Sequence, residues 1–228
     1  MDNIYVVGTD TNAGKTVLSL LLMQFFLKRG CRPFYLKPLQ TGCTDARAAD
    51  SDAAFIYRHV ASLQGKDPAQ SVLYCFKNPK APFFAARDEG RQIDLARLDR
   101  AVEEKSRLYD PLILEAAGGL LVPVGEGTLL ADTIKNTGAR VVLAARAGLG
   151  TINHTLLSLE ALRIRGLSPA GIVFLDGAGT PPDMIAENRE AVERHAGVGV
   201  AGVIGPIADF SHPPEDCYRP LEVIFGKS

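Results

Sequence analysis

The sequence GTDTNAGKT at residues 8–16 lies between a short run of β-branched and aromatic residues, 4–7, and an apolar periodic stretch, 17–28. This order predicts a strand, a loop and a helix. The backbone N–H groups of such a loop, together with the positive end of the helix, bind phosphate oxygens. Lys15 adds a positive charge, and the hydroxyl of Thr16 stands where it can reach a magnesium ion. Residues 8–16 are therefore predicted to bind the phosphates of a nucleotide.

The loop is longer than the common phosphate-binding motif, with five residues between Gly8 and Gly14 where the usual number is about four. The extra length puts the polar side chains of Asp10, Thr11 and Asn12 at the tip, beside the phosphates. We expect the tip to serve a second ligand as well as the nucleotide. A purely structural turn is the alternative, and the order of strand, loop and helix favours phosphate binding.

The same alternation of short apolar runs and helical segments continues along the chain. Further strands are expected at residues 33–36, 111–114, 140–145, 169–174 and 200–204, and further helices at residues 51–63, 95–108, 151–165 and 182–195. Such alternation builds a parallel sheet with helices on both faces. The sequence thus predicts a single α/β domain of the P-loop NTPase type over residues 1–228. Residues 74–90 are expected to be an irregular loop over the end of the sheet, where such folds bind ligands.

Composition and charge exclude several classes of protein. Lys and Arg number 25 against 26 Asp and Glu, a formal net charge of -1, so no positive field is available to hold nucleic acid. The longest apolar stretch near the start, residues 17–27, is only about half a membrane span, and no basic leader precedes it. We expect a cytoplasmic protein with no nucleic-acid or membrane partner. Its four cysteines are widely spaced, so neither a zinc site nor a disulfide is expected.

Three further charged residues are candidates for the phosphate site. Lys37 follows the second expected strand, and a cation there lies in the crevice where open α/β sheets bind ligands. Glu115 ends the third expected strand, before the small residues 116–119, where a carboxylate can face a metal ion bound to the nucleotide. Asp52 is a second candidate ligand for this ion. Helix capping is the alternative for Asp52, and periodicity alone does not distinguish the two.

Taken together, these motifs resemble those of the dethiobiotin synthetases, ATP-dependent enzymes of the penultimate step of biotin synthesis. The resemblance covers nearly the whole chain. It rests on residues 8–16, Lys37-Pro38 with Thr41-Gly42, Ser51-Asp52-Ala53, Ala81-Pro82 through Ala85-Ala86 to Glu89-Gly90, residues 115–119, and Gly148-Leu149-Gly150-Thr151-Ile152-Asn153-His154.

The resemblance implies a homodimer that uses ATP and magnesium to close a urea ring from 7,8-diaminopelargonate and carbon dioxide. One amine takes up carbon dioxide as a carbamate, and a carbamate oxygen attacks the γ-phosphate. The second amine then attacks the resulting carbamic-phosphoric anhydride and expels phosphate. Negative charge accumulates at every step, so positioned cations are the main requirement and no protein nucleophile is needed.

The resemblance also implies a role for each matching residue. Lys15 and Lys37 would flank the carbamate and the γ-phosphate. Thr11, a third catalytic candidate, and Thr41 would hydrogen-bond the carbamate or the diamine. The expected magnesium ligands are Thr16, Asp52 and Glu115. Asn153 would bind the carboxylate end of the diamine across the dimer interface. The remaining nucleotide or substrate contacts are expected from Asn12, Ala13, Gly14, Val17, Gly118, Gly205 and Pro206.

One position departs from the family pattern. Family members commonly carry an Asn-Asp pair after the fifth strand, whereas this chain reads Phe174-Leu175-Asp176. Leu175 has no amide to pair with a base, so a looser choice of nucleotide is expected.

Two alternative functions compete with this interpretation. Related amidating ligases carry a glutaminase module with a nucleophilic cysteine, and this chain has neither the length nor the motif for one. Switch or partition ATPases usually place a lysine directly after the first glycine of the loop, where this chain has Thr9. Dependence of phosphate release on the diamine distinguishes the enzyme from the switch.

Overall fold

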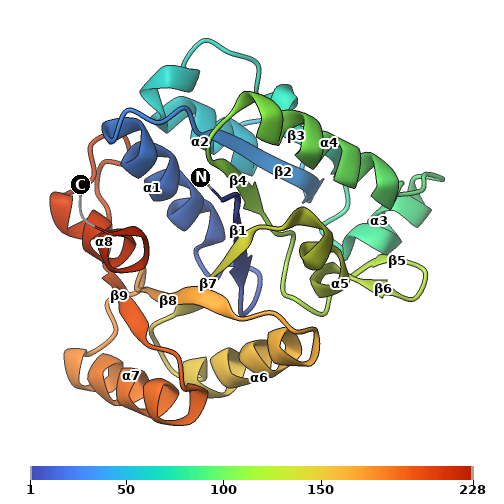
Figure 1. Ribbon diagram of the computed structural model, residues 1–228. Coiled ribbons are helices and arrows are strands. Elements are labelled where there is room, and N and C mark those ends of the chain that lie inside the picture. The colour runs from blue at the N-terminus through green and yellow to red at the C-terminus, as the bar shows by residue number, and fades with distance from the viewer. Residues whose placement is uncertain (1, 227–228) are drawn as a thin grey trace.

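A parallel sheet forms the centre of the computed structural model, which describes residues 2–226 (Figure 1). Its strands are β1 Ile4–Gly8, β2 Phe34–Thr41, β3 Val72–Phe76, β4 Leu112–Glu115, β7 Arg140–Arg146, β8 Pro169–Leu175 and β9 Val200–Ile204. They lie in the order β3-β2-β4-β1-β7-β8-β9, and each neighbouring pair is parallel. Because β1 is the middle strand, the loop that follows it leaves the sheet at the centre of its carboxyl edge.

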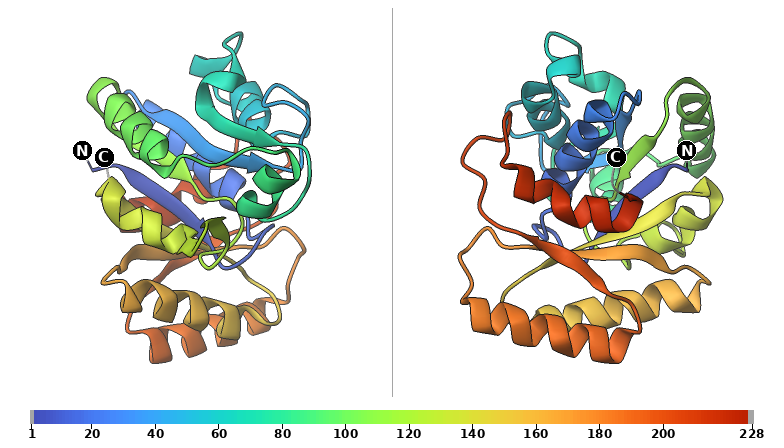
Figure 2. Two further views of the ribbon diagram at one scale, coloured as in Figure 1. Left: turned by 90° about the vertical axis from the view of Figure 1, so that its right-hand side faces the viewer. Right: turned by 60° about the vertical axis from the view of Figure 1, so that its left-hand side comes forward.

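Helices cover both faces of this sheet (Figure 2). One face carries α1 Lys15–Lys28, α2 Asp52–His59 and α8 Arg219–Phe225, and the other carries α3 Pro82–Asp88, α4 Leu95–Leu108, α5 Leu130–Ile134, α6 Thr151–Ile164 and α7 Pro182–Ala196. The connections contain the hairpin of β5 Pro123–Gly125 and β6 Thr128–Leu129, and the 3-10 helices Ala61–Leu63, Pro68–Ser71, Lys135–Thr137 and Glu215–Tyr218.

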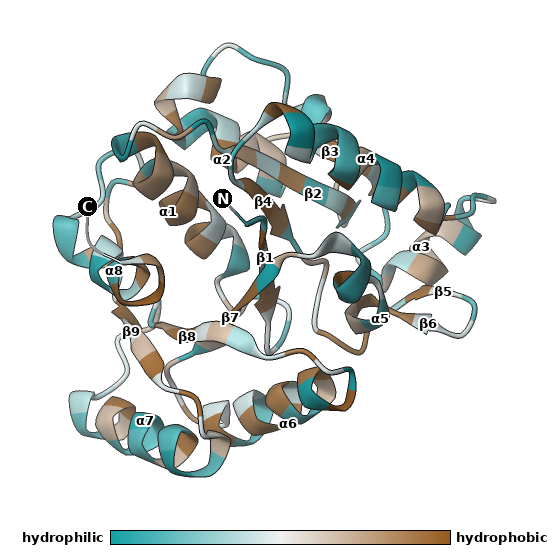
Figure 3. Ribbon diagram, viewed as in Figure 1, coloured by the Kyte–Doolittle hydropathy of each residue, from teal (hydrophilic) through white to brown (hydrophobic). Residues whose placement is uncertain are grey.

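Alternation of side chains along each strand supplies the two cores. In β1, Ile4 and Val6 pack with α1, whereas Tyr5 and Val7 belong to the core on the opposite face. Strands buried on both faces read as nearly continuous apolar runs. Helix α1 is also largely apolar and is buried along its middle turns, while α4 and α7 expose polar faces (Figure 3). Within residues 2–226, no helix combines the length and the apolarity needed to cross a membrane.

The predicted parallel α/β architecture is confirmed, but the expectation of an irregular loop at residues 74–90 is wrong. This region contains the end of edge strand β3 and the whole of α3. The strand has only β2 as a neighbour, and its five residues are followed by turn-forming Asn78 and Pro79. Pro82 belongs to a helix because proline is tolerated in the first helical turn. Both elements are therefore short and flanked by residues that otherwise indicate loops.

Two other boundaries differ from the sequence prediction. Lys37 lies within β2 rather than after it, because pairing with β4 ends near Leu36 while pairing with β3 continues from Lys37 to Thr41. The helix expected over residues 51–63 ends at His59, since the backbone of Val60 is extended. The longer β2 brings Lys37 to the interior of the sheet.

Candidate active site

The phosphate-binding loop joins β1 to α1 through residues 9–14. Gly14 precedes α1 in the left-handed conformation, with φ of 87°. A Cβ atom on Gly14 would lie 2.5 Å from the Cγ of Leu175. The backbone conformation and the close approach of Leu175 both require glycine here.

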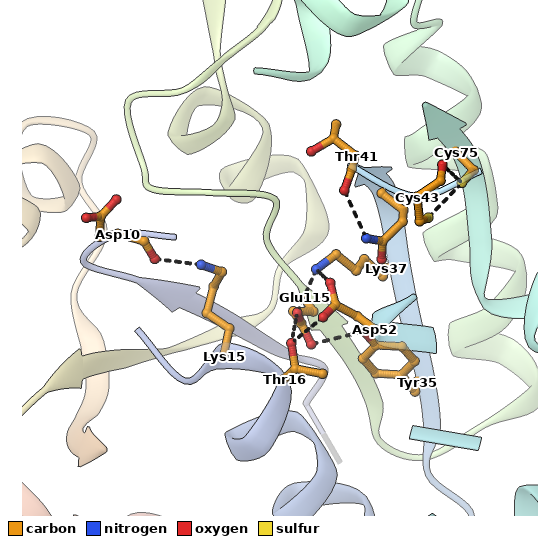
Figure 4. Close-up of polar contacts among 11 residues, drawn as sticks. Asp10, Lys15, Thr16, Tyr35, Lys37, Thr41, Cys43, Asp52, Cys75 and Glu115 are labelled. Carbon is orange, nitrogen blue, oxygen red and sulfur yellow. Dashed lines mark hydrogen bonds and ion pairs between the residues drawn. The ribbon is translucent and has the colours of Figure 1, made fainter. Parts of the chain in front are cut away.

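Lys15 reaches back over this loop from the first turn of α1. Its Nζ donates a hydrogen bond of 2.7 Å to the backbone oxygen of Asp10 (Figure 4). Burial is the main cause that lowers the pKa of Lys15 to about 8; the charge of Lys37 acts in the same direction, and the charges of Glu115 and Asp52 oppose the shift. The ammonium group is thus held above the loop, where bound phosphates would supply its counter-charge.

Two carboxylates from different elements meet at the hydroxyl of Thr16. The Oγ1 of Thr16 lies 2.9 Å from Oδ1 of Asp52 and 2.9 Å from Oε1 of Glu115. Asp52 is the first residue of α2, and Glu115 is the last residue of β4. The hydroxyl of Tyr35 in β2 donates to Oε2 of Glu115 at 3.0 Å. These contacts fix three hard oxygen groups at one point beside the phosphate-binding loop.

Lys37 neutralises this pair of carboxylates from the neighbouring strand. Its Nζ lies 2.8 Å from Oε1 of Glu115 and also forms a short ion pair with Oδ2 of Asp52. Burial alone would lower the pKa of Lys37, but Glu115 and Asp52 outweigh it and raise the pKa above its usual value. Burial likewise opposes ionisation of Asp52, and Lys37 holds the pKa of that carboxyl below its usual value. The ammonium of Lys37 and the carboxylate of Asp52 are therefore both charged at neutral pH.

The position of Asp52 bears on the two alternatives that the sequence left open. Ser51 is the N-cap residue of α2, and its side chain makes no capping hydrogen bond. The carboxylate of Asp52 accepts from Thr16 and Lys37. Its contacts thus point into the site rather than back to the helix.

A cavity of about 580 Å³ opens above this cluster. Most of the predicted substrate and metal residues line it: Thr11, Lys15, Thr16, Lys37, Thr41, Asp52, Glu115 and Gly118. Gly118 has φ of 73°, and a Cβ atom there would lie 3.8 Å from the Oγ1 of Thr11. The loops after β1 and β4 therefore meet at the cavity wall, as expected where ligands bind to open α/β sheets.

A second cavity, of about 460 Å³, lies on the other side of the phosphate-binding loop. Leu175, Gly205 and Pro206 line it, and Asn12, Gly14 and Val17 line both cavities. The loop therefore stands between a charged cavity and a more apolar one. This arrangement suits a nucleotide whose phosphates and base lie on opposite sides of the loop.

Two predicted residues line neither cavity. Ala13 belongs to the phosphate-binding loop and is completely buried. Asn153 is exposed on the first turn of α6, close in sequence to Leu149, which is 91% exposed. Within one copy of the chain, the structure does not bring Asn153 to the cluster around Lys37.

Several residues that shape the site are not among those predicted from the sequence. The hydroxyl of Tyr35 donates a hydrogen bond to Glu115. Tyr35 lies two residues before Lys37 on the same face of the strand, and this spacing could have indicated its place in the site. Lys80 and Pro82, in the region expected to be irregular, line the charged cavity. Phe210 and Thr180 line the second cavity and lie in loops without a recognisable motif.

Comparison with known proteins decides the family. Residues 2–214 match the family model described as an AAA domain. The "ATP-dependent dethiobiotin synthetase BioD" of Paramagnetospirillum magneticum is 38% identical over 207 residues, which cover 91% of this chain and 89% of that protein. The protein of the same name from Lysinibacillus sphaericus is 42% identical over 181 residues, which cover 76% and 75% of the two chains. The chain belongs to the dethiobiotin synthetase family.

A longer, bifunctional protein also matches. The "Biotin biosynthesis bifunctional protein BioCD" of Bordetella avium is 42% identical over 203 residues, 88% of this chain but 39% of that protein. This chain therefore spans less than half the length of that bifunctional protein.

Solved structures place the dethiobiotin synthetase fold among P-loop ATPases. The cell division ATPase MinD of Pyrococcus furiosus superposes with a TM-score of 0.60 at 15% identity, covering 98% of this chain and 97% of that one. The MinC:MinD complex of Aquifex aeolicus gives 0.62 at 14% identity, covering 100% and 97%. Identities this low establish a shared fold only, so these likenesses carry no argument for a switch or partition function.

Proposed function

We propose that this chain closes the ureido ring of dethiobiotin from 7,8-diaminopelargonate and carbon dioxide, with conversion of ATP to ADP and phosphate, in the cytoplasm. Family membership supports the reaction. One observation carries the proposal: two lysines and a group of hard oxygen ligands line one cavity beside the phosphate-binding loop. The lysines are Lys15 and Lys37, and the oxygen ligands are the Thr16 hydroxyl with the carboxylates that it contacts. A reaction through anionic intermediates needs this concentration of fixed charge.

The two lysines have distinct tasks in this proposal. Lys15, at the start of α1, binds phosphate oxygens and stabilises the charge that develops at the γ-phosphate. Lys37 holds the carbamate from the opposite wall of the cavity, so that its oxygen faces the γ-phosphate in line. Thr11 and Thr41 line the same cavity and orient the carbamate and the diamine through their hydroxyls. Positioning of this kind lowers the barrier without a protein nucleophile.

Thr16, Asp52 and Glu115 fit a magnesium ion by their chemistry. One hydroxyl and two carboxylates supply hard oxygen ligands around one point, and magnesium usually takes one or two carboxylates with water and phosphate oxygens. Bound magnesium would neutralise the phosphates and favour departure of ADP. Lys37 contacts the same two carboxylates and shares Oε1 of Glu115 with Thr16, so its ammonium becomes available to anionic substrate groups when these carboxylates bind a cation.

The second cavity is proposed to hold the base of the nucleotide. Gly205 and Pro206 form one wall, and Leu175 presents an apolar side chain where the family commonly has an amide. The carboxylate of neighbouring Asp176 already accepts hydrogen bonds from the backbone N–H and hydroxyl of Thr180. A wall of this kind packs against a base without reading its hydrogen-bonding edge, which supports a broad choice of nucleoside triphosphate.

We also propose a homodimer in which Asn153 serves the site of the other copy. Leu149 and Leu157, on the loop before α6 and on α6 itself, are 91% and 55% exposed. Asn153 lies between them in sequence and is also exposed. A second copy packed on this surface would bury the leucines and carry Asn153 toward the carboxylate end of a bound diamine.

One incubation tests the proposed reaction. Purified protein is mixed with diaminopelargonate, bicarbonate, magnesium and ATP, and dethiobiotin is sought by mass spectrometry. The proposal expects product together with phosphate release that depends on the diamine. Absence of product with ATP, CTP and GTP would overturn it, and phosphate release at an equal rate without diamine would favour a switch ATPase.

A further inference from the structure

Two cysteines that are far apart in sequence contact each other near the carboxyl ends of β2 and β3 (Figure 4). The Sγ atoms of Cys43 and Cys75 are 3.1 Å apart. Cys75 lies in β3, where its register partner in β2 is Gln40. Cys43 follows the end of β2, and the intervening Gly42 donates its N–H to the backbone oxygen of Phe76. The pair is therefore fixed by two adjacent strands, and wide sequence spacing was a poor guide to thiol proximity.

We propose that Cys43 and Cys75 form a reversible disulfide when the folded protein meets a peroxide. The two sulfur atoms need to approach by only about 1 Å to reach bonding distance. The backbone on both sides is held by the parallel ladder of β2 and β3, so the approach requires side-chain movement rather than unfolding.

The two cysteines differ in access, which orders the chemistry. Cys75 is partly exposed, whereas Cys43 is 3% exposed. The thiolate of Cys75 attacks the peroxide, the O–O bond breaks, and Cys75 becomes a sulfenic acid as hydroxide departs. The thiolate of Cys43 then attacks the sulfur of Cys75 and expels the second hydroxide. The two thiols lose two electrons and two protons in all, and the peroxide becomes two molecules of water.

The pKa values of the two thiols limit the rate of this reaction. Burial raises the pKa of Cys43 to about 12, and burial also raises the pKa of Cys75. The guanidinium of Arg91 donates to the backbone oxygen of Cys75 at 2.9 Å, and its charge acts in the opposite direction. Since thiolates are the reacting species, these raised pKa values make oxidation of the pair slow at neutral pH.

The cross-link would close the segment from residue 43 to residue 75, which contains α2 and the carboxylate of Asp52. Gly42 lies between Thr41 and Cys43, and a Cβ atom on Gly42 would lie 3.2 Å from Cβ of Pro79 in the cavity wall. Neither Cys43 nor Cys75 lines the cavity. The disulfide would therefore join the two ends of the segment that contains α2, and it would not block the site.

The test treats the purified full chain with hydrogen peroxide and reads intact mass, peptide mapping and the count of free thiols. The reduced chain has four thiols. We expect loss of two hydrogens, a Cys43–Cys75 peptide link, and a midpoint of thermal unfolding raised by about 5 °C or more. Dithiothreitol should reverse all three changes.

Single variants separate a built pair from indiscriminate oxidation. In Cys43→Ala, Cys75 should gain oxygen and form no internal link; in Cys75→Ala, buried Cys43 should stay reduced. Cys31→Ala is the matched control, because Cys31 packs near the core on the α1 face, and it should cross-link as the parent chain does. A link through Cys31 or Cys217, or oxygen addition to Cys75 in the parent chain without a link to Cys43, overturns the proposal. None of these readouts depends on the enzymatic reaction.

Discussion

The Nζ of Lys37 lies 2.8 Å from Oε1 of Glu115, and the two residues are 5% and 1% exposed. A buried ion pair contributes little to stability unless further polar contacts complete it. Here Thr16, Tyr35 and Asp52 complete it. Lys37 and Glu115 also line the cavity beside the phosphate-binding loop, so their charges are available to a ligand.

Replacement of Lys37 tests this arrangement. Lys37→Ala should abolish turnover, with a loss of about a thousandfold or more, since a preorganised cation for the carbamate and phosphate is removed. The fold should remain intact, because water entering the cavity can hydrate Asp52 and Glu115. Turnover assays and circular dichroism on the purified variant check both outcomes.

The control for this variant is Lys28→Ala. Lys28 forms an exposed ion pair with Glu215, and such pairs contribute about 0–1 kcal/mol. It should leave turnover unchanged. Near-normal turnover in Lys37→Ala would remove Lys37 from the mechanism.

The lowered pKa of Lys15 predicts opposite effects of alkaline pH on binding and on stability. With a pKa of about 8 in the folded protein and about 10.4 in the unfolded chain, Lys15 loses its proton first in the folded state. Between these values the unfolded chain binds more protons, so this residue makes stability rise with pH. Nucleotide binding should instead weaken above pH 8 as the positive charge disappears.

Titration of the apo protein with ATP from pH 7 to pH 9.5 measures the binding effect. The dissociation constant should rise through an apparent pKa near 8, while Lys15→Met should show weak binding and no such transition. A transition of equal size in Lys15→Met would assign it to another group.

Much of this site could be predicted because local sequence specifies it. Residues 8–16 contain the loop, its lysine and its threonine in consecutive order, and strand, loop and helix follow from periodicity. Lys37 and Glu115 could be located because charged residues at the carboxyl edge of a parallel sheet converge. Their direct contact required the strand order β2-β4-β1, which no local pattern determines.

The parts that could not be predicted depend on contacts between distant segments. Edge strand β3 has one neighbour and is followed by turn-forming residues, so its sequence resembles a loop. Cys43 and Cys75 meet only through the pairing of β2 with β3. Asp52 faces the site because of where α2 packs. The sequence could not reveal this, because a capping role would have produced the same sequence.

A buried amide anchors the loop that borders the second cavity. The Nε2 of Gln24 donates to the backbone oxygens of Phe210 at 2.8 Å and His59 at 3.1 Å, and its Oε1 accepts from the hydroxyl of Tyr218 at 3.0 Å. Gln24→Leu removes these hydrogen bonds and should cost about 2–4 kcal/mol, because buried polar groups lose their partners. Differential scanning calorimetry should show the unfolding midpoint lowered by about 5–12 °C.

Gln64→Leu provides the comparison for Gln24→Leu. Gln64 donates to the backbone oxygen of Arg58 from an exposed position, so its replacement should change the midpoint by no more than about 2 °C. Because Phe210 lines the second cavity, Gln24→Leu should also raise KM for the nucleotide more than KM for the diamine. Equal unfolding midpoints for the two variants would exclude the anchoring role.

The apolar wall of the second cavity predicts the choice of nucleotide. Leu175 stands against Gly14 of the phosphate-binding loop and lines the cavity with Gly205 and Pro206. Because Leu175 has no amide, one adenine-specific contact is missing, which reduces discrimination between nucleotides by about 1–3 kcal/mol. Turnover with ATP, CTP and GTP should therefore agree within about tenfold in kcat/KM.

Two variants of Leu175 test the role of its side chain. Leu175→Asn should raise the preference for ATP, while Leu175→Ala, which also lacks an amide, should keep the broad choice of nucleotide. A strong preference for ATP in the parent chain that survives in Leu175→Ala would mean that backbone groups of the cavity read the base, because the side chain at position 175 would then be irrelevant to selection.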